Sequence, residues 1–190
     1  MTDRFAILDL EWTAWEGSVE RRWTGPGEEI EIVQIGMAIF ADNTGIEEID
    51  SLEIFVRPHI NPDLSDYFIA LTGITQEEVD REGITFPDAL KRVSEFIANS
   101  IDTIHCFGSD GNVLRINCDL MGIDTPFPAE LFNSVREDIS EFVGLTNNGV
   151  ASSDLPELMG FDVPGNAHTA LADVRCIAQA LRIMRSAGAF

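Results

Sequence analysis

The sequence has little positive charge. Its 12 lysine and arginine residues stand against 33 aspartate and glutamate residues, which gives a formal net charge of −21. Proteins that bind duplex nucleic acid without sequence preference normally carry a basic face, and this composition argues against one. If the substrate is nucleic acid, binding must be local, through metal ions, backbone amides and stacking, and limited to a few nucleotides. We expect most of the acidic residues to form a solubilising surface.

Long apolar runs and patterned cysteines are also absent. No apolar run approaches the ~20 residues of a membrane span, and Met1–Phe5 lacks the basic and apolar regions of a signal peptide. Cys106, Cys118 and Cys176 are scattered and lack zinc-ligand spacing, which favours free thiols in a reducing cytosol. We therefore expect a cytoplasmic protein with no membrane partner, folded as a single domain over residues 1–190.

The first third of the chain predicts strands and the remainder mainly helices. Strands are expected at residues 5–10, 30–40 and 52–56, with a polar insertion at 12–29 that contains three tryptophans. Helices are expected after Thr75, with Glu78 completing a capping box, and at 87–99, 113–121, 136–143, 153–159 and 169–185, with short strands at 103–107 and 132–135. This order predicts an α/β fold with a mixed β-sheet flanked by helices.

Two acidic residues end the first predicted strand. Asp9 and Glu11 follow an apolar run, and in a strand their side chains would point to the same face, roughly 6.6 Å apart along it. Two neighbouring carboxylates repel each other unless a cation lies between them, and a hard divalent ion is the natural occupant. The alternative is a pair of ordinary residues on a solvated strand face, which the apolar run before them makes less favourable.

Three motifs in this order resemble those of a known family. They are Asp9-Leu10-Glu11-Trp12-Thr13, Phe107-Gly108-Ser109-Asp110 with Leu114, and His168-Thr169-Ala170-Leu171-Ala172-Asp173. They resemble the DEDDh exonucleases, the superfamily of ribonuclease T, oligoribonuclease and the proofreading subunits of DNA polymerases. Leu71-Thr72-Gly73-Ile74-Thr75 is similar to a further family segment. The insertion and the second strand resemble the branch with the histone-mRNA and siRNA-trimming exonucleases and bacterial relatives of the sporulation-inhibitor type.

The resemblance, from about Phe5 to Met184, implies an RNase-H-like fold and 3'→5' exonuclease activity with two Mg²⁺ or Mn²⁺ ions. By position, Asp9, Glu11 and Asp173 would hold the metal that carries the attacking water. Asp9 and Asp110 would hold the second metal, at the leaving 3' oxygen, and His168 would be the general base. Two-metal hydrolysis of a phosphodiester independently requires such a set, because carboxylates bind the ions and a histidine accepts a proton near neutral pH.

Asp110 is the least regular member of the set. The family usually has two residues between the glycine of the second motif and its aspartate, whereas only Ser109 stands there in this chain. Ser-Asp-Gly-Asn is also ordinary turn chemistry. Asp102 and Asp119 are the weaker substitutes. His168 could instead be a loop or helix-capping histidine, and Asp173 could face solvent from a helix.

Substrate contacts are expected from the residues that follow Glu11. Thr13 matches a family position whose backbone and hydroxyl approach the 3'-terminal nucleotide. Trp12 could stack on a base, a contact worth roughly 1–3 kcal/mol, although Trp12, Trp15 and Trp23 could equally be packing residues of the insertion. Phe68 is a candidate wedge against the next base.

The leading hypothesis is a metal-dependent exonuclease that releases nucleoside 5'-monophosphates from the 3' ends of single-stranded nucleic acid or short oligonucleotides, with RNA slightly favoured over DNA. The alternative is a non-catalytic module with the exonuclease fold that binds a protein or RNA partner; the net charge of −21 keeps this alternative open. Either a monomer or a homodimer is expected.

Overall fold

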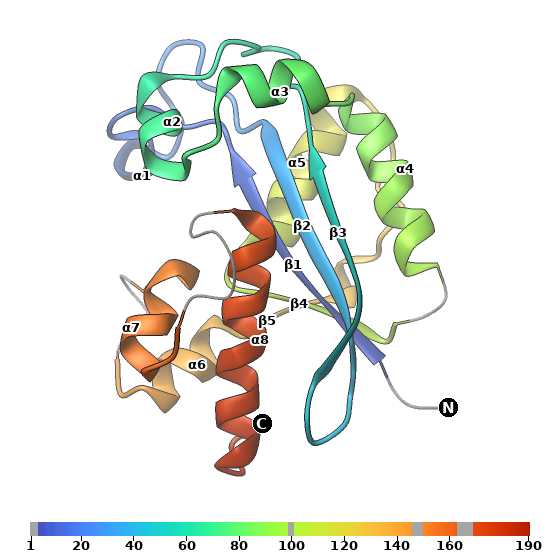
Figure 1. Ribbon diagram of the computed structural model, residues 1–190. Coiled ribbons are helices and arrows are strands. Elements are labelled where there is room, and N and C mark those ends of the chain that lie inside the picture. Colours follow the sequence, from blue (N-terminus) through green and yellow to red (C-terminus); the bar gives the residue numbers. More distant parts are fainter. Residues whose placement is uncertain (1–3, 99–100, 146–149, 163–168) are drawn as a thin grey trace.

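The computed structural model describes residues 4–98, 101–145, 150–162 and 169–190. At its centre is a five-stranded sheet in the order β3-β2-β1-β4-β5. The strands are β1 (Arg4–Trp12), β2 (Ile32–Ala41), β3 (Glu47–Phe55), β4 (Thr103–Cys106) and β5 (Phe132–Ser134). β1, β2 and β3 form an antiparallel meander, whereas β4 and β5 run parallel to β1 (Figure 1). The predicted α/β fold with a mixed sheet flanked by helices is confirmed.

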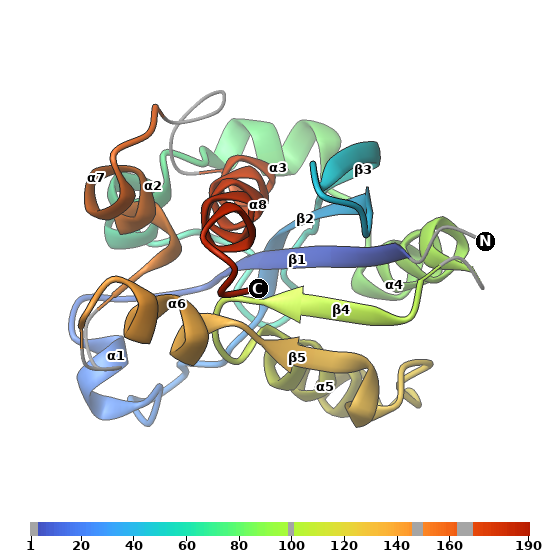
Figure 2. The ribbon, with the colours of Figure 1, turned by 90° about the horizontal axis from the view of Figure 1, so that it is seen from below.

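Helices cover both faces of the sheet (Figures 1 and 2). They are α1 (Ser18–Arg21), α2 (Asp66–Thr72), α3 (Gln76–Glu82), α4 (Phe86–Ile97), α5 (Asp110–Met121), α6 (Arg136–Phe142), α7 (Leu155–Met159) and α8 (Ala170–Ser186), with 3-10 turns at Ala129–Leu131 and Ser152–Asp154. α4 and α5 lie on one face, and α6, α7 and α8 lie on the other. Within the described part of the chain, no helix combines the length and apolar character needed to cross a membrane.

Alternation along β1 divides the apolar core between these two faces. Ala6 and Leu8 are fully buried in the core beneath α4 and α5. Phe5 and Ile7 point the other way and pack in the core formed with α6 and α8. Successive side chains of a strand point to opposite faces, so Asp9 must lie on the α8 side of the sheet.

Several element boundaries differ from those predicted. β3 begins at Glu47 rather than residue 52, because β2 pairs with its polar, exposed first residues at the sheet edge. α5 begins at Asp110 rather than at residue 113, and α1 and α2 were not predicted. The capping box at α3 is confirmed, since the Thr75 hydroxyl accepts from the Glu78 N–H and the Glu78 carboxylate accepts from the Thr75 N–H.

Candidate active site

Asp9 and Glu11 lie near the end of β1, on the face of the sheet that α8 covers. β1 is the central strand, and its hydrogen bonds to β2 and β4 fix the backbone on both edges. Asp9 is 7% exposed and Glu11 is half-buried. The strand therefore presents two carboxylates, held by a rigid backbone, in an environment that excludes most water.

Asp173 reaches this end of β1 because α8 begins directly on β2. Gly36 pairs with Asp9 across the β1–β2 ladder, and it makes this close approach possible. A Cβ atom on Gly36 would lie only 2.3 Å from the carbonyl carbon of Ala170, so any other residue would displace the first turn of α8. Asp173, in that first turn, is 6% exposed.

Two hydrogen bonds anchor the start of α8. The Oε1 atom of Gln34, fully buried in an otherwise apolar strand, accepts the N–H of Ala170 at 2.9 Å. The Thr169 hydroxyl caps the helix by accepting the N–H of Ala172 at 3.3 Å. Gln34 and Gly36 were not among the predicted site residues, although a glutamine and a glycine inside an apolar strand were the available signal.

Asp110 joins the cluster from the other neighbouring strand. β4 runs parallel to β1, so the carboxyl ends of both strands meet at one edge of the sheet, and α5 starts there. One Asp110 oxygen, Oδ1, accepts the backbone N–H of Leu10 at 3.2 Å, and the side chain is buried. Asp102 and Asp119 are both exposed. The geometry therefore favours Asp110 over these two substitutes as the fourth carboxylate.

The four carboxylates form a set that fits divalent cations. Asp9, Glu11 and Asp173 each offer an oxygen, and these atoms lie within 4.8 Å of one another. Asp110 lines the same cleft as these three. Oxygen ligands at this spacing suit Mg²⁺ or Mn²⁺. Carboxylates packed this closely repel one another, and this repulsion adds to the effect of burial on their pKa values.

Burial and mutual repulsion raise the pKa of three of these groups. Burial raises the pKa of Asp9 well above its usual range, and the charges of Asp110, Asp173 and Glu11 raise it further. Burial, followed by Asp173 and Asp110, raises the pKa of Glu11 to about 8. Burial raises the pKa of Asp110 to about 6, against the opposing effect of backbone N–H donors and Arg136. A bound cation would relieve this repulsion.

The carboxylates line a cleft of about 430 Å³. Among the described residues that line this cleft, the cationic side chain is that of Arg136, which was not among the predicted site residues. Its Nη2 atom donates to the Val150 carbonyl at 2.5 Å, and its guanidinium lies 5.6 Å from the centroid of the Phe107 ring. These contacts hold a positive charge beside the carboxylates; the available signal was an arginine directly after a short predicted strand.

Two tryptophans, Trp12 at the end of β1 and Trp23 in the loop after it, form another wall of the cleft. Trp12 and Trp23 both line it, with ring centroids 6.3 Å apart and planes inclined by 53°. Thr13 is buried: its hydroxyl donates to the Glu29 carbonyl at 2.6 Å and accepts the Glu31 N–H at 3.0 Å. The Thr13 hydroxyl thus ties the insertion to β2, and its contact with a nucleotide stays a prediction.

The roles of two further predicted residues stay predictions. His168, the predicted general base, lies outside the described residues, so its role stays a prediction. Phe68 is 1% exposed and packs in the small core formed with Val33, although it also lines the hollow beside Trp12, so its role as a wedge against a base stays a prediction. Tyr67 and Leu71, its neighbours on α2, are the exposed large hydrophobic side chains there.

Comparisons with known proteins agree with this geometry. A family model described as "Exonuclease" (RNase_T) matches residues 6–181. The human "3'-5' exoribonuclease 1" is 31% identical over 193 residues, which cover 96% of this chain and 53% of the relative. This chain thus spans about half the length of the curated relatives it matches over most of its own length.

Solved structures show the same fold. The nuclease domain of 3'hExo, described as a DEDDh family member bound to rAMP, superposes with a TM-score of 0.82 at 30% identity, covering 98% of this chain and 94% of that chain. A 3'-exonuclease in a structure of histone mRNA stem-loop recognition gives a TM-score of 0.83 at 29% identity, covering 98% of this chain and 65% of that chain. The predicted branch is thereby confirmed, and the chain belongs to the DEDDh exonuclease family.

Proposed function

We propose that this protein is a metal-dependent 3'→5' exonuclease that releases nucleoside 5'-monophosphates from single-stranded 3' ends. The observation that carries the proposal is the set of four carboxylates at the sheet edge, inside a domain of the exonuclease family. RNA is slightly favoured over DNA as substrate, because relatives are named exoribonucleases and similar structures concern rAMP and a histone mRNA stem-loop. Cytoplasmic location and a monomeric or homodimeric state stay predictions from the sequence.

The carboxylates divide naturally between two divalent ions. Asp9, Glu11 and Asp173 would hold one ion, and Asp9 with Asp110 would hold the other. When bound, such ions lower the pKa of water, neutralise charge on the phosphate and stabilise the leaving oxygen. We propose His168 as the base that accepts the proton of the attacking water, on its place in the third motif.

An apolar end of the cleft suits the 3'-terminal base. Val19 on α1 is 65% exposed and Leu71 on α2 is 54% exposed, and both line the cleft beside Trp12 and Trp23. A base inserted between these side chains would stack on aromatic surface and cover apolar surface from water. This apolar seat, formed by Trp12, Val19, Trp23 and Leu71, would hold one nucleotide through its base and needs no basic face. An acidic chain could therefore bind a nucleic-acid 3' end.

Arg136 is positioned to act on the phosphate. It lies in the cleft with the carboxylates, and its bond to the Val150 carbonyl and its contact with the Phe107 ring fix its position. We propose that its guanidinium donates to a phosphate oxygen and so orients the scissile bond. The same charge opposes the rise in the pKa of Asp110 that burial causes.

The test is degradation of matched RNA and DNA oligonucleotides labelled at the 5' end, with Mg²⁺, Mn²⁺ or EDTA. We expect a metal-dependent ladder that shortens from the 3' end and disappears in Asp9→Asn, which removes the ligand shared by both ions. Asp102→Asn removes an equal charge from an exposed position and should retain the ladder. An unchanged ladder in Asp9→Asn would overturn the proposal; the absence of a ladder on any substrate would favour a non-catalytic binding module.

A further inference from the structure

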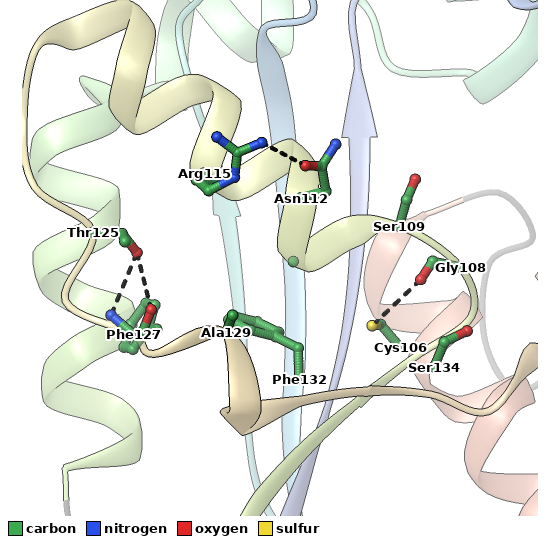
Figure 3. Close-up of a pocket in the computed structure, with 11 residues that line it drawn as sticks. Cys106, Gly108, Ser109, Asn112, Arg115, Thr125, Phe127, Ala129, Phe132 and Ser134 are labelled. Atoms are coloured by element: carbon green, nitrogen blue, oxygen red, sulfur yellow. Dashed lines mark hydrogen bonds between the residues drawn. The ribbon is translucent and has the colours of Figure 1, made fainter.

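A second hollow lies beside the catalytic cleft. It has a volume of about 350 Å³ and lies between the start of α5 and the segment that leads through β5 (Figure 3). Side chains that define it include Ser109, Asn112, Arg115, Phe127, Phe132 and Ser134; we call it the Phe132 pocket. Gly108 and Ser109 line both hollows, so the Phe132 pocket lies next to the catalytic cleft.

The floor of the Phe132 pocket is aromatic. Phe132 is half-buried, and its ring packs edge-to-face with that of Phe127, with centroids 6.3 Å apart. Gly111 supports the ring from the first turn of α5, since a Cβ atom there would lie 2.7 Å from the Phe132 ring. The ring is therefore held in one orientation while part of it remains accessible, as a stacking platform for a base requires.

Arg115 places positive charge at the rim of this pocket. Its Nη1 atom donates to Asp119 at 2.9 Å and its Nη2 atom to the Asn112 side chain at 2.8 Å, the second bond being drawn in Figure 3. These two bonds fix the plane of the guanidinium and use only part of its five N–H donors. None of the described residues that line the pocket is acidic, in contrast to the cleft beside it.

The two ends of the catalytic cleft differ in a way that gives the substrate a direction. The apolar seat of Trp12, Trp23 and Leu71 lies at one end, and no lining residue of the smaller hollow around it is shared with the Phe132 pocket. If the 3'-terminal nucleotide fills that seat, with the scissile phosphate at the carboxylates, the preceding nucleotide must lie on a side of the cleft away from the seat. Gly108 and Ser109 line the cleft but not the seat, and they also line the Phe132 pocket.

We propose that the Phe132 pocket is a subsite for a nucleotide upstream of the scissile bond, with its base on Phe132 and its backbone phosphate at Arg115. This inference rests on the proposed exonuclease function. It gives the chain a local cationic and aromatic contact for a single strand, and it makes turnover depend on substrate length. A substrate without an upstream nucleotide would gain nothing from the pocket.

The experiment compares kcat/KM for a pentanucleotide with kcat/KM for the p-nitrophenyl ester of a nucleoside 5'-monophosphate, which has no upstream nucleotide. The quantity of interest is the ratio of kcat/KM for the pentanucleotide to kcat/KM for the ester. We expect Phe132→Leu, which keeps apolar packing but removes the ring, to lower this ratio about 5- to 30-fold by raising KM for the pentanucleotide. Arg115→Gln should lower it about 3- to 10-fold.

Arg92→Gln is the matched control, since Arg92 is exposed on α4 and lines neither hollow. Thermal melting of each variant checks that the fold is intact. Wild-type ratios in Phe132→Leu and Arg115→Gln, with both substrates still hydrolysed, would overturn the subsite and leave the exonuclease function standing. A wild type that hydrolyses neither substrate would overturn the proposed function and, with it, the subsite.

Discussion

Two parts of the catalytic cleft are built differently. They are the carboxylate edge (Asp9, Glu11, Asp110 and Asp173) and the tryptophan wall (Trp12 and Trp23). The carboxylates come from β1, α5 and α8, and contacts between elements far apart in the sequence, such as Gly36 against Ala170, bring them together. The wall joins Trp12, the last residue of β1, to Trp23 in the loop that follows, where hydrogen bonds within residues 13–31 hold the chain. Arg22 and Trp23 have positive φ angles, which is typical of a tight loop.

This difference separates chemistry from substrate choice. The carboxylates stand on a buried sheet and a capped helix, so their spacing is fixed before substrate arrives. Trp23 stands on a loop, which we propose contacts the substrate's base, and loops tolerate sequence change better than the elements they connect. Substitutions that disturb the carboxylate edge should therefore lower kcat, and substitutions in the tryptophan wall should raise KM.

The largest effect is expected at the predicted base. His168→Ala should lower kcat by ~10²–10⁴-fold, the usual contribution of a general base, with Mn²⁺ affinity nearly unchanged. Single-turnover hydrolysis and calorimetric Mn²⁺ titration measure the two quantities. An equal loss of metal affinity would show that His168 is instead a metal ligand.

A smaller effect is expected when the contact beneath α8 is changed. Gly36→Ala places a Cβ against the backbone of Ala170, so α8 must shift and carry Asp173 with it. We expect kcat to fall by up to about 100-fold and the free energy of unfolding to fall by ~1–3 kcal/mol. Gly45→Ala is the control, since its Cβ would meet only ordinary contacts. Wild-type turnover in Gly36→Ala would mean that the carboxylate spacing does not depend on this contact.

The fold and much of the cluster were accessible from the sequence because they rest on local patterns. A continuous apolar run predicted β1, and motif order predicted that Asp9, Glu11, Asp110 and Asp173 belong together. The contact that Gly36 permits was not predictable, because it joins β2 to a helix that begins more than a hundred residues later.

Other features escaped prediction because tertiary contacts decide them. The first residues of β3 are polar and exposed, and only pairing with β2 makes them a strand. Arg136 becomes a cleft residue through the Val150 carbonyl and the Phe107 ring, which lie elsewhere in the sequence.

At the wall we expect an effect on binding. Trp12→Leu keeps an apolar side chain but removes the aromatic surface beside the terminal base. KM for oligonucleotides should rise about 5- to 30-fold, with kcat within a few-fold of wild type. Steady-state kinetics measure both parameters. A decrease in kcat with unchanged KM would show that Trp12 acts in the chemical step, as the carboxylates do, and would contradict the separation of the two regions.

The smallest effect concerns stability and pH. Burial and the neighbouring carboxylates raise the pKa of Glu11 to about 8 and that of Asp110 to about 6, above their unfolded values. Between its unfolded and its folded pKa, each of these groups binds more protons in the folded metal-free protein than in the unfolded chain. The free energy of unfolding should therefore fall as the pH rises from the unfolded pKa of these carboxyl groups towards 8. Melting temperatures in EDTA measure this fall, and saturating Mg²⁺ should reduce it. A melting temperature that rises over this range would contradict the repulsion.

The most direct test of the account is thermal melting of wild type and Asp9→Asn, each with and without Mn²⁺. We expect Asp9→Asn to melt above wild type in EDTA, because a buried carboxyl group that its neighbours repel is replaced by a neutral amide. Mn²⁺ should raise the melting temperatures of wild type and of the control Asp102→Asn by an amount that grows with the logarithm of its concentration, and it should not raise that of Asp9→Asn. An equal Mn²⁺ response in all three proteins would assign the ion to the acidic surface and contradict a metal site built on Asp9.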